Sequence, residues 1–297
     1  GGTGKTPVVK RLARELTAAG YQVAILSRGY QGDFSGEVGV VSDGKEVFLT
    51  AEEAGDEAYM LAQSLDQVPV LVGSDRTKTG KYAGRYFDPD FILLDDGFQH
   101  WSVARDYEVV VLDGTRPFSN GYLLPRGKLR EPVSSLERGD LFIITRADQA
   151  TKQKLREIKQ RLVQVNPGPE IISSCHRPTY LRPVGKSATR EPDLAAKRVL
   201  AVSGIGNPES FERTLEELGA EIAAKKRFRD HHAYTYEEIV EIFTLASEAG
   251  VDKIVTTEKD AVSINWELIE KIDRQGIEME VLGIELKFLE PADKWQD

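Results

Sequence analysis

The chain opens with Gly1-Gly2-Thr3-Gly4-Lys5-Thr6, and this glycine-rich stretch indicates the fold class. The order Gly-Lys-Thr is typical of a phosphate-binding loop, in which backbone N–H groups cradle phosphates, the ammonium reaches the β and γ oxygens and the hydroxyl holds Mg²⁺. Apolar residues at helical spacing follow from Pro7 to Leu16, so the helix that such a loop needs is predicted. A chance glycine turn is the alternative. The pattern predicts that the nucleotide is bound by Gly1, Gly2, Thr3, Gly4, Lys5 and Thr6.

Short apolar runs without polar alternation follow along the chain, at residues 23–26, 70–72, 91–94, 109–112 and 141–144. Such runs are expected for strands that are covered on both faces. Helical or turn segments lie between them, and this alternation predicts an α/β fold with a parallel sheet. A phosphate-binding loop normally follows a buried strand, so we also expect a strand before residue 1.

The alternation of predicted strands and helices is interrupted between residues 178 and 193, where prolines and a polar run occur. A second cycle then begins, with strands predicted at 199–202 and 253–256 and helices at 211–218 and 235–249. The alternating tail from 277 to 289 is predicted to return as a strand to the first lobe. The predicted domains are a nucleotide-binding lobe over 1–185, a smaller α/β lobe over 186–276 and a returning strand and tail over 277–297.

Composition excludes several classes of protein. Of 297 residues, 40% are hydrophobic and 29% are charged, which argues against intrinsic disorder. The 48 acidic residues outnumber the 39 basic ones and give a net charge of −9, which argues against general nucleic-acid binding. No apolar run approaches the roughly 18 residues of a membrane-spanning helix. The single cysteine, Cys175, cannot form an internal disulfide, which fits a reducing compartment.

The run Phe91-Ile92-Leu93-Leu94-Asp95-Asp96-Gly97 ends an apolar strand in two carboxylates. A parallel strand would deliver these side chains to the sheet edge that carries the phosphate loop, where Mg²⁺ needs oxygen ligands. Strands that end in an Asp-Gly turn are common, and the upstream Gly-Lys-Thr favours the metal. We predict Mg²⁺ ligands at Thr6, Asp95 and Asp96, with the Gln99 amide and the His100 imidazole beside them.

Three further groups carry candidate chemistry. Asp56 and Glu57 start a predicted helix, where capping is the simpler explanation. Asp230-His231-His232 resembles part of a zinc site, but adjacent histidines point apart and no third ligand is suitably spaced. The third group is a set of basic residues that either solvates a face or binds an anionic headgroup with apolar chains: Arg28, Arg76, Lys78, Lys81, Arg85, Arg126, Lys128 and Arg130.

Taken in order, these motifs resemble the tetraacyldisaccharide 4′-kinase family of lipid A biosynthesis. The resemblance extends from residue 1 to about residue 262 and includes Ser27-Arg28-Gly29-Tyr30, Gly55-Asp56-Glu57, Asp95-Asp96-Gly97-Phe98-Gln99-His100, Leu129-Arg130-Glu131-Pro132, Asp230-His231-His232 and Thr257-Glu258-Lys259-Asp260. Departures from the family pattern are the front of the chain, where the family carries a hydrophobic helix, and the basic Arg126-Gly127-Lys128.

The resemblance implies ATP- and Mg²⁺-dependent phosphorylation of the 4′-hydroxyl of an acylated glucosamine disaccharide 1-phosphate. It implies a P-loop kinase-type parallel sheet with helices on both faces, and a smaller α/β lobe joined by a two-stranded linker. Asp56 would be the general base, His231 its partner once the lobes close, and Lys5 the catalytic cation. The resemblance also assigns a group to substrate contacts or to the layer behind them: Glu57, Gln99, His100, Arg28, Arg76 and Arg130.

The implied location is the cytoplasmic face of the bacterial inner membrane, reached through a segment before residue 1. No nucleic acid and no obligate protein partner are expected. Other classes stay open on the residues alone: an ATPase with a deviant phosphate loop that switches partners, an ATP-dependent small-molecule ligase, and a non-catalytic lipid-binding module.

Overall fold

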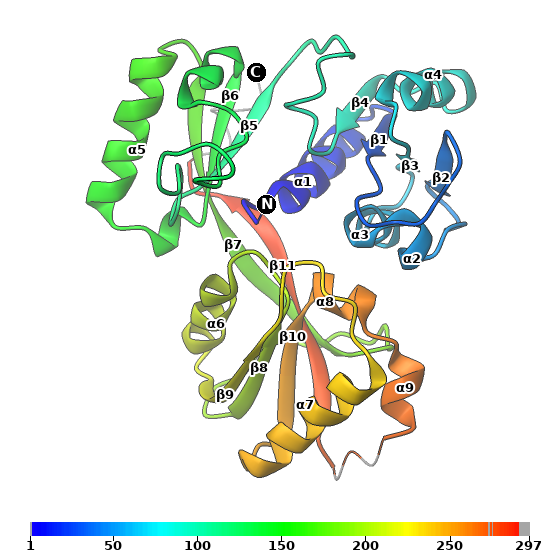
Figure 1. Ribbon diagram of the computed structural model, residues 1–297, viewed down its shortest axis with the longest axis vertical. Helices are drawn as coiled ribbons and strands as arrows, with labels where there is room; N and C mark the ends of the chain where they lie inside the picture. Colours follow the sequence, from blue (N-terminus) through cyan, green and yellow to red (C-terminus); the bar gives the residue numbers. More distant parts are fainter. Residues whose placement is uncertain (1, 273, 275, 291–297) are drawn as a thin grey trace. The chain divides into compact units, whose positions relative to one another are not determined.

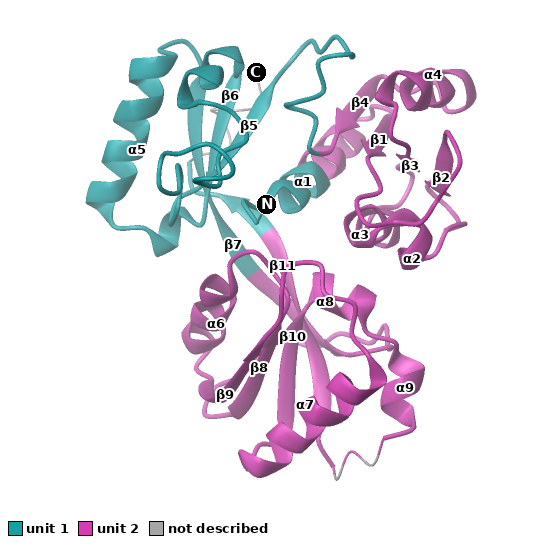
Figure 2. Ribbon diagram, in the orientation of Figure 1, with its two compact units in different colours: residues 1–11, 96–177, 286–297 teal, residues 12–95, 178–285 magenta. Residues whose placement is uncertain are grey.

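The computed structural model describes residues 2–272, 274 and 276–290 (Figure 1). Gly1 and the end of the predicted tail, residues 291–297, lie outside the described residues. The chain forms two compact units, each built from separate segments (Figure 2). Unit 1 comprises residues 1–11, 96–177 and 286–297, and unit 2 comprises residues 12–95 and 178–285. The predicted division after residues 185 and 276 stays a prediction.

Unit 1 contains a parallel sheet in the order β5 (Val109–Asp113), β6 (Leu141–Thr145) and β7 (Glu170–Pro183). Its core is formed by the apolar face of α5 (Lys152–Val165) against the sheet, with Ile158 and Leu162 packed on Phe142 and Ile144. Two 3₁₀ helices complete the unit, η1 (Val133–Arg138) and η2 (Ala147–Gln149). Helix α1 (Lys5–Ala18) begins here and ends in unit 2.

Unit 2 contains a four-stranded sheet in the order β2 (Gly39–Ser42), β3 (Val70–Val72), β1 (Val23–Ser27) and β4 (Phe91–Leu94). The helices of this part are α2 (Ala51–Ala54), α3 (Asp56–Ser64) and α4 (Arg76–Tyr86). Strand β2 is antiparallel to β3 and was not predicted. Because β4 is the edge strand of this sheet, Phe91 and Ile92 are 41% and 40% exposed, although the sequence predicts a strand covered on both faces.

The rest of unit 2 is a second parallel sheet with helices on both faces. Its strands are β9 (Glu221–Arg227), β8 (Arg198–Ser203), β10 (Lys253–Thr257) and β11 (Glu278–Phe288), and its helices are α6 (Pro208–Glu217), α7 (Tyr236–Glu248), α8 (Glu258–Ser263) and α9 (Trp266–Glu270). Alternate residues of β8 face opposite ways: Leu200 packs with Ile242 of α7, whereas Ala201 packs with Leu215 of α6. The period-2 direction of strand side chains therefore places a helical layer on each face.

Strands β7 and β11 each run from one unit into the other and form the predicted two-stranded linker. They also join β5 and β6 to the second sheet, in the order β5-β6-β7-β11-β10-β8-β9. The runs predicted to share one parallel sheet are thus divided between two sheets, because an apolar run does not specify which strand it pairs with. Among the residues described above, no helix is long and apolar enough to cross a membrane.

Candidate active site

The phosphate loop lies at the start of α1. Gly2 and Gly4 have φ of 75° and 88°, a backbone conformation that glycine adopts without steric cost. A Cβ on Gly4 would also lie 3.2 Å from His176 Nε2 and 3.3 Å from Thr145 Cγ2, so a side chain there would be crowded. Helix α1 begins at Lys5, and its unsatisfied N–H groups follow the loop directly. This loop and helix fit the phosphates of a nucleotide.

Thr145, the last residue of β6, and Arg146, which follows it, support this loop through its carbonyl groups. The Thr145 hydroxyl donates to the Thr3 carbonyl at 2.7 Å, and Arg146 Nη1 donates to the Gly2 carbonyl at 2.9 Å. Arg146 also pairs with Asp113 at 2.6 Å, and these two side chains are only 8% and 7% exposed. Since the loop carbonyls are bonded on this side, the loop N–H groups remain for a ligand. Sequence analysis missed this support, because strand-end polar residues carry no motif of their own.

Beside the loop, Lys5 and Arg130 share one carboxylate. Lys5 Nζ lies 3.3 Å from Asp96 Oδ1, and Arg130 Nη1 lies 2.7 Å from Asp96 Oδ2. Burial by itself raises the pKa of Asp96, but the charges and hydrogen bonds of Lys5 and Arg130 outweigh it and hold this pKa below its usual value. Asp96 is therefore ionised at neutral pH, as a Mg²⁺ ligand must be.

Gln99 and Glu131 extend this cluster. Gln99 Nε2 donates to Glu131 Oε1 at 3.0 Å, and Glu131 pairs with Arg138 at 2.8 Å. The backbone of His100 is fixed by a hydrogen bond from its N–H to the Gly97 carbonyl at 2.8 Å. The structure thus brings together Lys5, Asp96, Gln99 and Arg130, all within unit 1.

The remaining predicted metal ligands, Thr6 and Asp95, are buried. The Asp95 N–H donates to the Leu26 carbonyl at 3.0 Å, so β4 ends at this carboxylate beside the end of β1. Among the described residues no three His, Cys, Asp or Glu side chains gather as a metal site. A Mg²⁺ ion on a nucleotide takes few protein ligands and completes its shell with phosphate and water oxygens. Thr6 and Asp96, both in unit 1, carry oxygen atoms of the kind Mg²⁺ prefers, and ligation by Thr6, Asp95 and Asp96 stays a prediction.

In unit 2, the start of α3 meets the loop before α7. Asp56 Oδ2 lies 3.6 Å from His231 Nδ1, and Ser263 Oγ donates to Asp56 Oδ1 at 3.0 Å. His231 has φ of 61°, and its ring packs against Tyr30 with centroids 5.2 Å apart. The family resemblance implies that Asp56 and His231 meet only when two lobes close. In the structure both residues lie in unit 2 and are close together, where α3 packs on α8.

Lys259 contacts these predicted residues, although sequence analysis did not select it. Its Nζ lies 3.1 Å from His231 Nε2 and 2.6 Å from Asp230 Oδ1, and 3.9 Å from Glu57. The ammonium therefore joins both predicted acidic motifs to the histidine. The available signal was Thr257-Glu258-Lys259-Asp260, which follows a strand of the parallel sheet.

Asp260 and Glu258 of that tetrapeptide accept hydrogen bonds from other parts of unit 2. Asp260 is buried and accepts hydrogen bonds from Gly204 N at 2.8 Å, Tyr234 Oη at 2.9 Å and Thr257 Oγ1 at 2.6 Å. Burial raises the pKa of Asp260 above its usual value despite these bonds. Glu258 accepts from Tyr180 Oη at 2.7 Å, and burial together with this carboxylate raises the pKa of Tyr180 to about 12.

The predicted basic group is not one exposed surface. Arg76, in the first turn of α4, is buried and donates a hydrogen bond to the Gly73 carbonyl at 2.6 Å. It therefore cannot belong to a solvated basic face. Lys78 is paired with Glu37. Arg28 is exposed.

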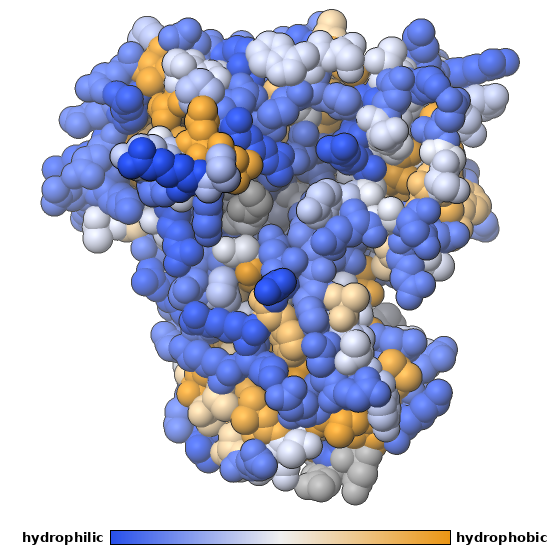
Figure 3. All heavy atoms as spheres, in the orientation of Figure 1, coloured by the Kyte–Doolittle hydropathy of each residue, from blue (hydrophilic) through white to orange (hydrophobic). Residues whose placement is uncertain are grey.

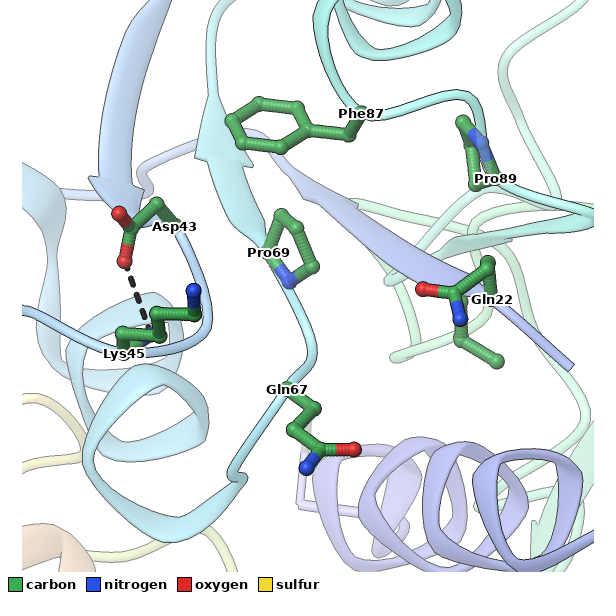
Figure 4. A pocket seen from close by; sticks show the side chains of 8 residues that line it. Gln22, Asp43, Lys45, Gln67, Pro69, Phe87 and Pro89 are labelled. Carbon is green, nitrogen blue, oxygen red and sulfur yellow. Dashed lines mark hydrogen bonds between the residues drawn. The ribbon is translucent and has the colours of Figure 1, made fainter. Parts of the chain in front are cut away.

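A surface cavity in unit 2 lies away from the predicted residues (Figure 4). It is lined by Gln22, Val23, Asp43, Lys45, Gln67, Pro69, Phe87 and Pro89. These residues lie before or at the amino ends of β1, β3 and β4 or just after β2, and Asp43 there accepts from the Lys45 N–H. Ligands of parallel sheets bind at the carboxyl ends, so this cavity is not the candidate active site.

Comparison with known proteins is consistent with this geometry. A family model described as tetraacyldisaccharide-1-P 4′-kinase matches residues 1–296. The tetraacyldisaccharide 4′-kinase of Halothermothrix orenii is 42% identical over 304 residues, which cover 99% of this chain and 79% of that protein. The tetraacyldisaccharide 4′-kinase of Anaeromyxobacter dehalogenans strain 2CP-C is 41% identical over 297 residues, covering 99% of this chain and 76% of that protein.

A similar solved structure is the "apo" form of LpxK from Aquifex aeolicus in complex with ATP. It matches with a TM-score of 0.70 and 30% identity, over 99% of this chain and 82% of that chain. The predicted P-loop kinase-type α/β fold is thereby confirmed. By sequence and by fold, the chain belongs to the tetraacyldisaccharide-1-phosphate 4′-kinase family.

Proposed function

We propose that this protein transfers the γ-phosphate of ATP to the 4′-hydroxyl of a tetraacylated glucosamine disaccharide 1-phosphate, a step of lipid A biosynthesis. Support comes from the family match over residues 1–296 and from the ATP bound by the similar LpxK. The observation that carries the proposal is the pair Asp56 and His231, 3.6 Å apart. A partner-switching ATPase or a ligase does not need a general base for a sugar hydroxyl.

In this mechanism Asp56 accepts the proton of the 4′-hydroxyl while that oxygen attacks the γ-phosphorus. The bond from this phosphorus to the β,γ-bridging oxygen breaks, and ADP leaves. His231 Nδ1 faces Asp56, and Lys259 faces the other ring nitrogen at 3.1 Å, so the ring is held from both sides. Proton transfer of this kind contributes ~10²–10⁴-fold, whereas positioning and charge neutralisation carry most of phosphoryl transfer.

Other residues would neutralise the charge of the transferred phosphoryl group. The Lys5 ammonium would leave Asp96 for the β and γ oxygens, and Arg130 would keep that carboxylate oriented. Thr6, Asp95 and Asp96 would hold Mg²⁺, which neutralises phosphate charge when bound. We place the reaction at the cytoplasmic face of the bacterial inner membrane, because an acylated substrate meets ATP there.

The test is a double-mutant cycle on Asp56→Ala and His231→Ala, with ³²P transferred from ATP to the lipid disaccharide in detergent micelles and resolved by thin-layer chromatography. Each single variant should lose ~10²–10⁴-fold in kcat. The double variant should lose little more, because residues that act as a unit are strongly non-additive. ATP affinity should stay unchanged in all three.

His232→Ala is the matched control. His232 neighbours His231 but pairs with Glu238 at 2.8 Å and stacks on Phe228. It should keep near-normal transfer. Losses that simply multiply, or equal losses at His231 and His232, would reject the proposed pair.

A further inference from the structure

One loop of unit 1 exposes consecutive apolar side chains. Tyr122, Leu123 and Leu124 are 45%, 45% and 63% exposed. Within residues 2–272, 274 and 276–290, no other run of three large apolar side chains is exposed. Scattered apolar side chains are normal on a protein surface, whereas a contiguous set marks a contact surface. We call residues 116–130 the apolar loop.

Backbone groups of the apolar loop form hydrogen bonds with one another. Leu124 N–H donates to the Leu129 carbonyl at 2.9 Å, Gly127 N–H to the Leu123 carbonyl at 2.8 Å, and Leu129 N–H to the Tyr122 carbonyl at 3.2 Å. A Cβ on Gly127 would collide with the Tyr122 carbonyl, so glycine is required at this turn. A segment that enters an apolar layer must satisfy its own backbone groups, and these hydrogen bonds do so across the turn.

Basic residues flank Tyr122, Leu123 and Leu124 along the sequence. From Arg116 to Arg130 the sequence contains four basic residues and no acidic one, in a chain of net charge −9. The Arg126 guanidinium lies 3.7 Å from the centre of the Tyr122 ring, so cation and apolar surface are adjacent. Over the loops beside β5, strongly hydrophilic and hydrophobic side chains adjoin one another (Figure 3). An apolar tip with basic flanks is complementary to an anionic lipid surface.

The apolar loop leads directly into the candidate active site. Arg130 ends the loop and pairs with Asp96 at 2.7 Å, and Asp96 in turn lies 3.3 Å from Lys5. A lipid headgroup at the loop would therefore be near the residues that handle the γ-phosphate.

We propose that Tyr122, Leu123 and Leu124 insert into the anionic lipid surface that presents the substrate, with Arg126 and Lys128 on its headgroups. This inference rests on the proposed function for the identity of that surface. It assigns lipid docking to the described residues of unit 1, independently of any segment before residue 1.

The test is co-sedimentation of the 297-residue chain with vesicles of phosphatidylcholine alone or with about a third phosphatidylglycerol, over a salt series. Wild type should prefer the anionic vesicles. Leu123→Ser with Leu124→Ser should weaken partitioning about tenfold or more. Arg126→Gln with Lys128→Gln should abolish the preference for anionic vesicles and its salt dependence. Val163→Ser removes an equally exposed apolar side chain from α5 and should bind like wild type.

Several outcomes would overturn the proposal: no wild-type binding to either vesicle, unchanged binding of the leucine variant, or an equal loss in Val163→Ser. A wild-type dimer in solution that the leucine variant converts to a monomer would show that a second copy covers the loop instead. ATP affinity and circular dichroism of each variant check that the fold is intact. Phosphorylation of detergent-dispersed disaccharide is measured in parallel, and failure of wild type in that assay alone would reject the proposed function rather than the docking surface.

Discussion

Replacing Arg146 is expected to destabilise unit 1 and to loosen the phosphate loop. Arg146 and Asp113 are almost fully buried and lie 2.6 Å apart, and Arg146 also donates to the Gly2 carbonyl at 2.9 Å. Arg146→Met keeps the apolar stem but leaves the Asp113 carboxylate buried without its cation. Breaking a buried pair by removing one partner costs ~3–5 kcal/mol.

The structure favours the lower end of this range. Asp113 Oδ1 still accepts hydrogen bonds from the Thr115 N–H at 2.8 Å and its hydroxyl at 2.6 Å, so the stranded carboxylate keeps part of its solvation. We expect a loss of about 3 kcal/mol in the free energy of unfolding. Arg146→Met with Asp113→Asn should cost less than Arg146→Met alone, because no buried charge is left uncompensated.

Urea denaturation measures the free energies, and the exposed pair Arg198 and Glu221, 3.1 Å apart, supplies the control. Arg198→Met should cost about 0–1 kcal/mol, as exposed ion pairs do. In Arg146→Met the KM for ATP should rise by a larger factor than kcat falls. In Arg146→Lys the KM should rise less, because a lysine can still reach one of the two partners. Equal unfolding free energies for Arg146→Met and Arg198→Met would refute the reasoning.

Three further changes follow from the geometry. Lys5→Ala should lower phosphate transfer by ~10²-fold or more, because developing charge on the γ-phosphate loses its cation; near-normal turnover in the ³²P assay would contradict this. Burial, with the charge of Arg146, lowers the pKa of His176 to about 3 from its ordinary 6.5. Between these two pH values His176 is therefore protonated in the unfolded chain and neutral in the folded chain. Stability is therefore complete above pH 6.5 and falls as the pH drops, and His176→Gln should flatten the urea-derived slope by up to ~1.4 kcal/mol per pH unit; an unchanged slope would exclude this role. Asp260→Asn puts an amide N–H₂ against the Tyr234 hydroxyl and the other donors around this buried acceptor, and should cost ~1–3 kcal/mol in urea denaturation; a neutral effect would mean that these hydrogen bonds do not require the carboxylate.

Sequence alone determined where several of the helices and strands lie. The predicted strands at 141–144 and 253–256 correspond to Leu141–Thr145 and Lys253–Thr257, and the predicted helix at 235–249 to Tyr236–Glu248. These predictions hold because the period of apolar residues and the capping residues act within a few positions along the chain. The Gly-Lys-Thr order likewise placed a glycine at position 4, where φ is 88° and the start of α1 follows.

The pairing of strands was not available from the same patterns. The buried apolar runs have similar sequences, so no local pattern distinguished the strands of one sheet, β1, β3 and β4, from the strands β5 and β6 of the other. The antiparallel strand β2 has only two consecutive apolar residues, Val40 and Val41, and it is recognised as a strand only by its pairing with β3.

For the site, residue patterns could identify candidate side chains but could not predict which of them lie close together. Asp56 alone is explained as a helix start, and His231 could not be separated from His232; only the resemblance to a kinase family paired Asp56 with His231. The structure brings the two to 3.6 Å and adds Lys259, and it bonds Arg146 to Gly2 across 144 positions of sequence. Such contacts are decided by the packing of segments far apart in the chain, since side-chain periodicity describes which face a residue is on and not what that face meets.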